Sequence, residues 1–328
     1  MSRCYALPDI DASSYIRHSL HGEDCVWVEK NCYVDLLIEV IHALGLEPHA
    51  MLPFVVAVDF VGDQWTFFKP QHSELRDMYG LDIQEMSTWR PLLDHAAEHL
   101  CAERLISAET DAYWLPDTSG TDYRQQHVKT TIALTNIDLQ KQRLGYFHNS
   151  GYYELEGEDF RQIFRIDALP DPSFLPLYAE LIHIKQVKHR DIQELSKLSG
   201  DLLRKYVSLI PQSNPVKRFA DRFERELPIM HAHGLAYYHL WAFNNIRQLG
   251  AAFELGAAFL RWLTKHNKLD MMPAIDSFEK ISSANKSLIL KVARSVNANR
   301  PLDLTELFAD MANDWDRGMS CLVDKLKT

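Results

Sequence analysis

The sequence predicts an α+β domain followed by an all-helical domain, in a chain of 328 residues. The first half mixes short helical patterns with strand patterns of period two, whereas almost everything beyond residue 176 has apolar residues at helical spacing. A proline-rich segment, 167–176, separates the two halves and is the expected hinge. We therefore expect an α+β domain over residues 1–168 and a helical domain over residues 174–328.

The first half should contain an early helix over residues 31–44. Asn31 fits the N-cap, apolar residues recur at positions i, i+3, i+4 and i+7, and Gly45 and Pro48 end the pattern. The helix therefore begins at Asn31-Cys32, which puts a cysteine in its first turn.

Two hairpins are expected in the same half. The first has strands over 51–60 and 64–70, around Val61-Gly62-Asp63. The second has strands over 127–137 and 143–149, and the numbers of its paired residues should sum to roughly 280. The remaining segments are helices at 73–80 and 88–104, a strand at 105–115, and a closing segment at 151–166.

The second half reads as a series of helices, one of which should be buried on all sides. The expected helices are 174–209, 215–226, 233–265, 274–296 and 303–327. Residues 233–265 are apolar nearly all round, and His239, Arg247 and Glu254 fall in one sector of that helix. Two interpretations stay open. These groups form an internal network, or they bind the carboxylate or amino group of a small amino-acid-like substrate at the domain interface.

Composition excludes several classes of protein. The formal net charge is −10, and no basic cluster is longer than a dipeptide, so nucleic acid is not an expected partner. No run of 18 apolar residues and no signal-like N-terminal region occurs, so we expect a soluble cytoplasmic protein without a membrane partner. Nucleotide-phosphate motifs are absent, and no bound cofactor is expected. The five cysteines are irregularly spaced, which predicts free thiols rather than disulfides or a zinc site.

Cys32 is the expected nucleophile. Unpaired N–H groups and the positive end of the helix dipole stabilise a thiolate in a first turn. A cysteine enzyme also needs a base and a group that orients the base, and the chain offers His127 at the start of one hairpin strand and Asn149 at the end of the next. The alternative is that Cys32 is an inert packing residue.

The order Cys32, His127, Asn149 resembles that of papain-like cysteine enzymes, which implies a papain-like fold for the first domain. Peptidase motifs around the cysteine are absent, and no glutamine lies shortly upstream. Beside the N–H of Cys32, Asn31 or Trp27 would therefore have to supply the second donor of the oxyanion hole.

A closer resemblance covers nearly the whole chain. The blocks NCYVDLLIEVIHALGLEP, DFVGDQWTFFKP, YWLPDTSGTDYR, HVKTTIAL, LGYFHNSGYYELEGEDF and RQLGAAFELGAAFLRWL resemble the bacterial domain of unknown function family 1839. The arrangement is also similar to butirosin biosynthesis protein H, an acyltransferase. That resemblance implies that Cys32 accepts an aminoacyl-type group from the phosphopantetheine of a carrier protein and passes it to a small-molecule amine in a biosynthetic pathway.

Other functions remain open at this stage. The same residues would serve a cysteine amide or thioester hydrolase, and the chain could be a carrier-binding protein without catalysis. In the loop before His127, the residues Asp117, Thr118 and Tyr123 are candidates for substrate binding, or they form turns that satisfy their own hydrogen bonds.

A metal site is not expected. Residues 95–99, HAAEH, match the inverted zinc-peptidase string. The helical pattern, however, places Trp89 on the apolar stripe and His95 and Glu98 on the opposite, wet face.

Overall fold

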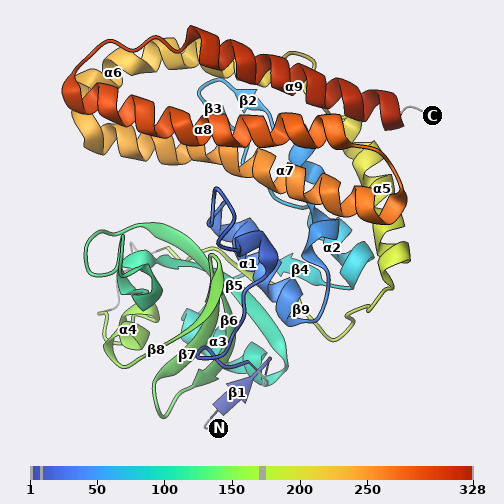
Figure 1. Ribbon diagram of the computed structural model, residues 1–328. Helices are drawn as coiled ribbons and strands as arrows, with labels where there is room; N and C mark the ends of the chain where they lie inside the picture. The colour runs from blue at the N-terminus through green and yellow to red at the C-terminus, as the bar shows by residue number, and fades with distance from the viewer. Residues whose placement is uncertain (1–2, 8–9, 170–174, 327–328) are drawn as a thin grey trace. The chain divides into compact units, whose positions relative to one another are not determined.

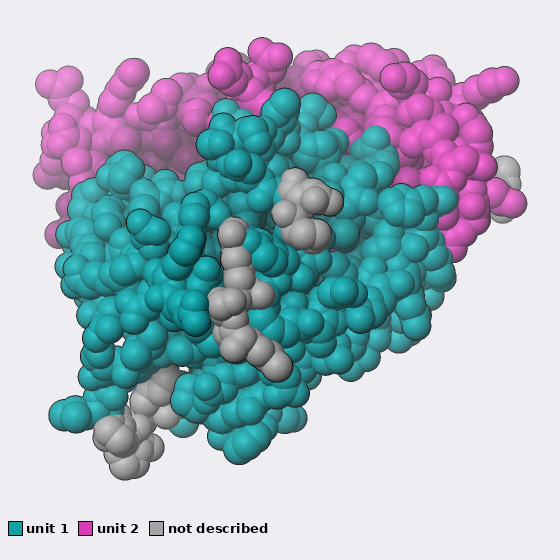
Figure 2. All heavy atoms as spheres, turned by 90° about the horizontal axis from the view of Figure 1, so that it is seen from below, with its two compact units in different colours: residues 1–19, 32–48, 71–189 teal, residues 20–31, 49–70, 190–328 magenta. Residues whose placement is uncertain are grey.

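The computed structural model describes residues 3–7, 10–169 and 175–326, and the chain divides into two compact units, coloured separately in Figure 2. Unit 1 consists of residues 1–19, 32–48 and 71–189, and unit 2 of residues 20–31, 49–70 and 190–328.

The division differs from the expected boundary at 168 and 174, because the segment after the hinge contributes a strand to unit 1. That strand, β9 (Ala179–His183), pairs with β4 (Asp82–Glu85) and with β5 (Arg104–Asp111). A helix was expected from residue 174, and this part of the prediction is wrong. The short apolar run is compatible with a helix or a strand, and hydrogen bonding to a strand on each side stabilises the strand. Of the predicted hinge, residues 170–174 lie outside the described residues.

Unit 1 is built on an antiparallel sheet, as expected for an α+β domain (Figure 1). Seven strands of the described residues form it, in the order β4-β9-β5-β6-β7-β8, and β1 pairs with β6. The further strands are β1 (Arg3–Tyr5), β6 (Lys129–Asp138), β7 (Arg143–His148) and β8 (Gly151–Glu156).

The hairpin of β6 and β7 has the predicted register. Ala133 pairs with Phe147 and Leu134 with Tyr146, and a bulge then shifts the register before Asn136. The expected sum of paired residue numbers is therefore confirmed. Because the side-chain period of a strand is two, this register decides which residues share a face of the sheet.

The helices of unit 1 are α1 (Cys32–Ala43), α2 (His72–Tyr79), α3 (Leu92–Cys101) and α4 (Glu158–Ile163). Helix α1 contacts β6, β7 and β8, and every residue from Tyr33 to Ile41 is buried, including Asp35 and Glu39. It is therefore a central helix of its unit.

In α3 the predicted orientation is confirmed for Glu98, which is exposed, and is wrong for His95 and Trp89. His95 is 5% exposed and Trp89, just before the helix, is 78% exposed. The helix begins only at Leu92, so Trp89 precedes it and does not extend its apolar stripe.

In unit 2 the predicted first hairpin is present, but both of its strands are shorter than the expected 51–60 and 64–70. Strands β2 (Phe60–Val61) and β3 (Gln64–Trp65) pair around Gly62. Residues Pro48–Ala57 form a 3-10 helix where a strand was expected. Pro48 and Pro53 lack the N–H groups that a strand ladder requires, which explains the difference.

Beyond residue 190 the described chain is helical, as predicted. The helices are α5 (Ile192–Val207), α6 (Pro215–Asn244), α7 (Ile246–Asn267), α8 (Met272–Ala298) and α9 (Thr305–Leu326). Helix α7 is the buried one and packs against α5, α6 and α8, while α8 also packs against α9 (Figure 1). The single helix expected over 233–265 is divided at Asn245. Among the helices of the described segments, none is long and apolar enough to cross a membrane.

One pair of cysteines forms a disulfide, although free thiols were expected. Cys4, in β1, and Cys101, the last residue of α3, form a disulfide. The prediction of free thiols is wrong for these two, since spacing in the sequence does not show that β1 and α3 lie side by side. Cys25, Cys32 and Cys321 do not take part in a disulfide.

Candidate functional site

Cys32 is the first residue of α1 and lies over strand β6. Its thiol is half-buried, and its Sγ lies 3.8 Å from the Oγ1 of Thr131. The first N–H groups of a helix have no partner within the helix. Position and partial exposure therefore suit a thiol that reacts with a bound electrophile.

His127 is paired with a carboxylate from the neighbouring strand. Its Nδ1 lies 2.6 Å from Oδ2 of Asp111, and its ring stacks on that of Tyr113 with centroids 4.4 Å apart. A carboxylate that accepts from Nδ1 fixes the tautomer of an imidazole and leaves Nε2 as the basic nitrogen. The pair is open to solvent, because 70% of the His127 side chain is exposed.

The register of β5 and β6 places these groups on the same face of the sheet. Glu109 pairs with Thr131, and Asp111 pairs with Lys129. Residues i and i+2 of a strand share a face and lie roughly 7 Å apart. Thr131, which lies next to Cys32, is therefore separated from Asp111 by about 7 Å along the strand direction. Within the described parts of the chain, no hydrogen bond joins His127 to Cys32.

Asn149 does not lie beside His127. It has a φ of +46° and occupies the turn between β7 and β8, where the left-handed conformation suits an asparagine. The carboxylate of Asp111, rather than Asn149, contacts the imidazole of His127.

The opposite face of the sheet carries a buried polar array centred on His148. Its Nδ1 lies 2.6 Å from Oδ2 of Asp117, and its Nε2 lies 2.7 Å from Oγ1 of Thr130. Tyr146 donates to the other oxygen of Asp117 at 2.5 Å. Asp117, expected as a substrate-binding residue, is thus bonded to the sheet itself.

The two other candidates of that loop are also bonded within unit 1. The Thr118 hydroxyl donates to the carbonyl oxygens of Ala112 and Leu115, at 3.0 and 2.9 Å. The Tyr123 hydroxyl donates to Asp159 at 2.9 Å. These contacts hold the loop in shape and correspond to the interpretation of self-satisfied turns.

In unit 2, Glu254 and Arg247 hold the backbone of the segment 26–30. Glu254 accepts from the N–H groups of Val26 and Trp27, at 2.6 and 3.1 Å. Arg247 donates from Nε and Nη2 to the carbonyl oxygen of Lys30, at 3.3 and 3.1 Å. His239, by contrast, is exposed on α6.

Trp27 and Asn31 also have defined partners in unit 2. The indole N–H of Trp27 donates to the hydroxyl of Ser282 at 3.0 Å, and the amide of Asn31 donates to the carbonyl oxygen of Phe68 at 2.9 Å. A Cβ at Gly250 would lie 2.5 Å from the Trp27 ring, so α7 needs a glycine at this place. The side-chain donors of Trp27 and Asn31 are therefore hydrogen-bonded to residues of unit 2.

A polar cluster around Glu180 in unit 1 was not predicted. Glu180, fully buried in β9, accepts from the hydroxyl of Tyr33 at 2.7 Å and from that of Tyr178 at 2.8 Å. His72 places its Nε2 3.4 Å from the same carboxylate and 2.8 Å from the Tyr33 hydroxyl. The four positions are spread along the sequence, and no motif links them.

The hydrogen-bond directions of this cluster follow from its donors. Tyr33 has a single hydroxyl proton, which it donates to Glu180, so Nε2 of His72 must donate to the Tyr33 oxygen. Burial, followed by the nearby Glu180 charge, raises the pKa of Tyr33 well above its ordinary value. The phenol therefore stays protonated, and Nδ1 is the nitrogen of His72 that is able to accept a proton.

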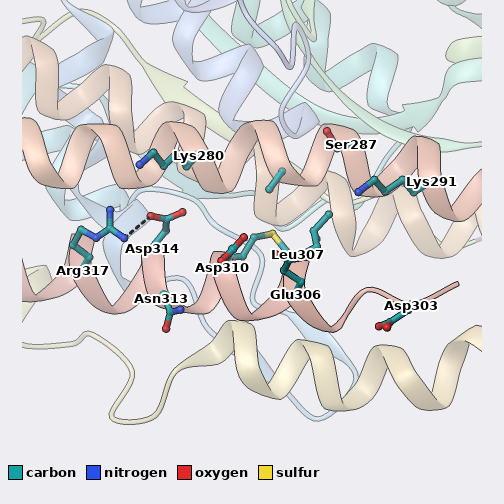
Figure 3. Close-up of a pocket in the computed structure, with 12 residues that line it drawn as sticks. Lys280, Ser287, Lys291, Asp303, Glu306, Leu307, Asp310, Asn313, Asp314 and Arg317 are labelled. Carbon is teal, nitrogen blue, oxygen red and sulfur yellow. Dashed lines mark ion pairs between the residues drawn. The ribbon is translucent and has the colours of Figure 1, made fainter.

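The helical unit has a polar groove of about 690 Å³ between α8 and α9 (Figure 3). Lys280 and Lys291 come from α8, and α9 contributes acidic residues together with Arg317, which pairs with Asp314 at 3.4 Å. Both signs of charge line it, as on many solvated helix pairs. The groove therefore indicates no particular ligand.

Comparison with known families gives matches over most of the chain. The DUF1839 N-terminal domain matches residues 16–184, and the DUF1839 C-terminal domain matches residues 192–324. The chain belongs to the DUF1839 family. The N-terminal DUF1839 domain includes Cys32 and His127, and the C-terminal DUF1839 domain includes Arg247 and Glu254. No curated protein matches the chain, and neither the resemblance to butirosin biosynthesis protein H nor that to papain-like enzymes finds support in these matches.

Proposed function

We propose that this DUF1839 protein is a cysteine-dependent acyltransferase in which Cys32 carries the acyl group. The observation that supports this most is the half-buried thiol at the first residue of α1, on the sheet face that also carries the His127–Asp111 pair. The placement of this cysteine over a strand that follows a histidine supports a papain-like arrangement as part of the proposal.

The donor in this proposal is a thioester on the phosphopantetheine of a carrier protein. The Cys32 thiolate attacks the thioester carbonyl, the new C–S bond forms, and the pantetheine thiolate leaves and takes up a proton. An amine then attacks the Cys32 thioester, forms the amide bond, loses its proton to the base, and returns the Cys32 thiol. Exchange between two thioesters is nearly thermoneutral, so catalysis requires mainly a thiolate and stabilisation of the oxyanion.

His127 is the proposed base, with Asp111 in the orienting role that the sequence had assigned to Asn149. The thiol and the imidazole sit at levels roughly 7 Å apart along the sheet. Hydrogen bonds between catalytic groups are often long without substrate and shorten only in the complex. An acyl-pantetheine chain between the two groups would provide the contact that brings them together.

Transfer of label from a carrier protein tests the proposal. The purified full-length chain is mixed with a carrier protein that bears a radiolabelled aminoacyl thioester, and label on the chain is measured. Wild type and Cys321→Ala should take up label, and Cys32→Ala should not. Cys321 is the matched control because it is also free and only partly exposed. Label that stays on the carrier with wild type contradicts the proposal.

Product analysis then separates transferase from hydrolase. Addition of a small primary amine should convert the Cys32 thioester to an amide faster than water converts it to a free acid. Free acid as the main product in the presence of amine would indicate a hydrolase that uses the same thiol.

A non-catalytic carrier-binding protein is the second candidate. Two observations favour it: in the described chain Cys32 has no hydrogen bond to an imidazole, and the predicted binding residues Arg247 and Glu254 are engaged with the backbone. For this function, pull-down of the carrier would survive Cys32→Ala while no label moves.

A further inference from the structure

The proposed acyl transfer still needs a second donor for its oxyanion hole. Attack on a thioester moves an electron pair onto the carbonyl oxygen, and donors placed about 3 Å from that oxygen stabilise the charge. The N–H of Cys32, the first residue of α1, is one such donor. The side-chain donors of Trp27 and Asn31, which were expected to supply the second, are bonded to Ser282 and Phe68. These two side chains therefore do not complete the hole.

Thr131 is the side chain that meets the sulfur of Cys32. Its Oγ1 lies 3.8 Å from Sγ and accepts from the thiol. A hydroxyl can donate as well as accept, and within the described residues the hydroxyl proton of Thr131 has no acceptor. Both side chains are half-buried. An unused hydroxyl proton therefore lies beside the proposed nucleophile, where a substrate can reach it.

The hydroxyl of Thr131 is within reach of the reacting oxygen. The oxygen of an acyl group lies two bonds from the sulfur that carries it, so a donor in contact with the sulfur is also close to that oxygen. During attack the negative charge moves from Sγ to the carbonyl oxygen. The proton of a hydroxyl rotates to the acceptor that it meets, so it follows the charge without any change in the backbone.

The charges around Thr131 permit an oxyanion. Glu109 is paired with Thr131 across β5 and β6, and residues that oppose each other in this way share a face of the sheet. Lys129 donates from Nζ to the Glu109 carboxylate at 2.5 Å and offsets its charge. The N-terminus of α1 also carries the positive end of the helix dipole, which stabilises negative charge that develops beside it.

We propose that the hydroxyl of Thr131 is the second donor of the oxyanion hole, together with the N–H of Cys32. The inference rests on the proposed acyl transfer and adds a catalytic residue to it. The Cys32 thiolate attacks, the C–S bond forms, and the carbonyl electron pair moves onto the oxygen that Thr131 meets. When the C=O bond forms again, the pantetheine thiolate leaves and takes up a proton. The same two donors act when the amine attacks the Cys32 thioester.

Two reactions of Cys32 separate this role from a structural one. Transfer from the labelled aminoacyl carrier protein passes through an oxyanion. Alkylation by iodoacetamide does not, because the sulfur displaces iodide from a saturated carbon. Thr131→Val keeps the shape of the side chain and removes the hydroxyl, so it should slow label uptake by roughly 100-fold or more. It should leave the alkylation rate unchanged at high pH, where the thiol is fully ionised in every variant.

Three further variants serve as controls. Thr131→Ser retains the hydroxyl and should restore label uptake. Thr88→Val changes another half-buried threonine of unit 1 and should react like wild type in both assays. Thr131→Ala also lacks the hydroxyl and should lose as much label uptake as Thr131→Val, which covers the case in which valine disturbs the packing.

The outcomes distinguish this inference from the proposed function. Label uptake by Thr131→Val at the wild-type rate overturns the inference and leaves the acyltransferase intact. An equal loss in the alkylation rate at high pH would show that the hydroxyl acts on the sulfur or on the fold, and it would also overturn the inference. Wild type that takes up no label removes the proposed function and the inference with it.

Discussion

The hydroxyl of Tyr33, in the first turn of α1, lies 2.7 Å from the carboxylate of Glu180 in β9, 147 positions further along the chain. Tyr178 and His72 complete the set of groups around this fully buried carboxylate. The cluster thus ties the start of the cysteine-bearing helix to the sheet beneath it.

Glu180→Gln should destabilise the protein by about 2–4 kcal/mol, because an amide cannot accept from all the donors that meet the buried carboxylate. Tyr33→Phe removes the bond to Glu180 and the bond from His72, and should cost about 1–3 kcal/mol. Urea denaturation of both variants gives the free energies of unfolding. Ser13→Ala, at an exposed position, is the control with no change expected. A Glu180→Gln protein as stable as wild type would show that the cluster does not hold α1 in place.

The choice of base is tested by two histidine variants. His127→Gln should slow acyl transfer onto Cys32 by roughly 100-fold, the usual effect of losing a general base. His72→Gln keeps the His127–Asp111 pair and should change the rate much less. The initial rate of label uptake in single-turnover assays is the measurement. A large loss of rate in His72→Gln together with a small loss in His127→Gln would show that His72 is the base. Tyr33 and Glu180 hold the Nε2 of His72 in that case.

Stability should fall in mild acid because of His95 and His99. Burial, assisted by neighbouring arginines, holds the pKa of both below the ordinary value of 6.5. The unfolded chain therefore takes up these protons first, so their contribution is complete above about pH 6.5 and is lost as the pH falls toward the folded values. The melting temperature between pH 7.5 and 5 measures this effect.

Two histidine variants distinguish protonation of His95 from a general loss of stability in acid. His95→Leu should flatten the loss of melting temperature below pH 6.5. His239→Leu, which changes an exposed histidine, should leave the profile as it is. Parallel profiles for wild type and His95→Leu would contradict the assignment.

Gly250→Ala should destabilise unit 2 by about 1–3 kcal/mol, since the added methyl group overlaps the Trp27 ring. Alanine is intrinsically better than glycine in a helix by about 1 kcal/mol, so a net loss reports the overlap itself. Gly120→Ala, where a Cβ meets nothing within 4 Å, is the control. Thermal unfolding measures the stability of both variants. A Gly250→Ala protein more stable than wild type would mean that the Trp27 ring moves aside without cost.

Local patterns in the sequence predicted much of the secondary structure. The period-two segments gave β5, β6 and β7, and the numbers of the paired residues in β6 and β7 followed from the turn between them. The helical periodicity predicted α1 and the helices beyond residue 190. Two of the failures were Pro48–Ala57 and β9, where prolines and pairing with distant strands outweighed local apolar patterns.

The sequence by itself determined that Cys32 begins a helix and that His127 lies at the start of a strand, although β6 begins only at Lys129, because capping and periodicity act between near neighbours. Only the tertiary structure decided the partner of each group: Asp111 for His127, Glu180 for Tyr33 and His72, and the backbone of residues 26–30 for Arg247 and Glu254. Such contacts join positions far apart in the chain, and they depend on strand register and on the burial of charged groups, which no local pattern encodes.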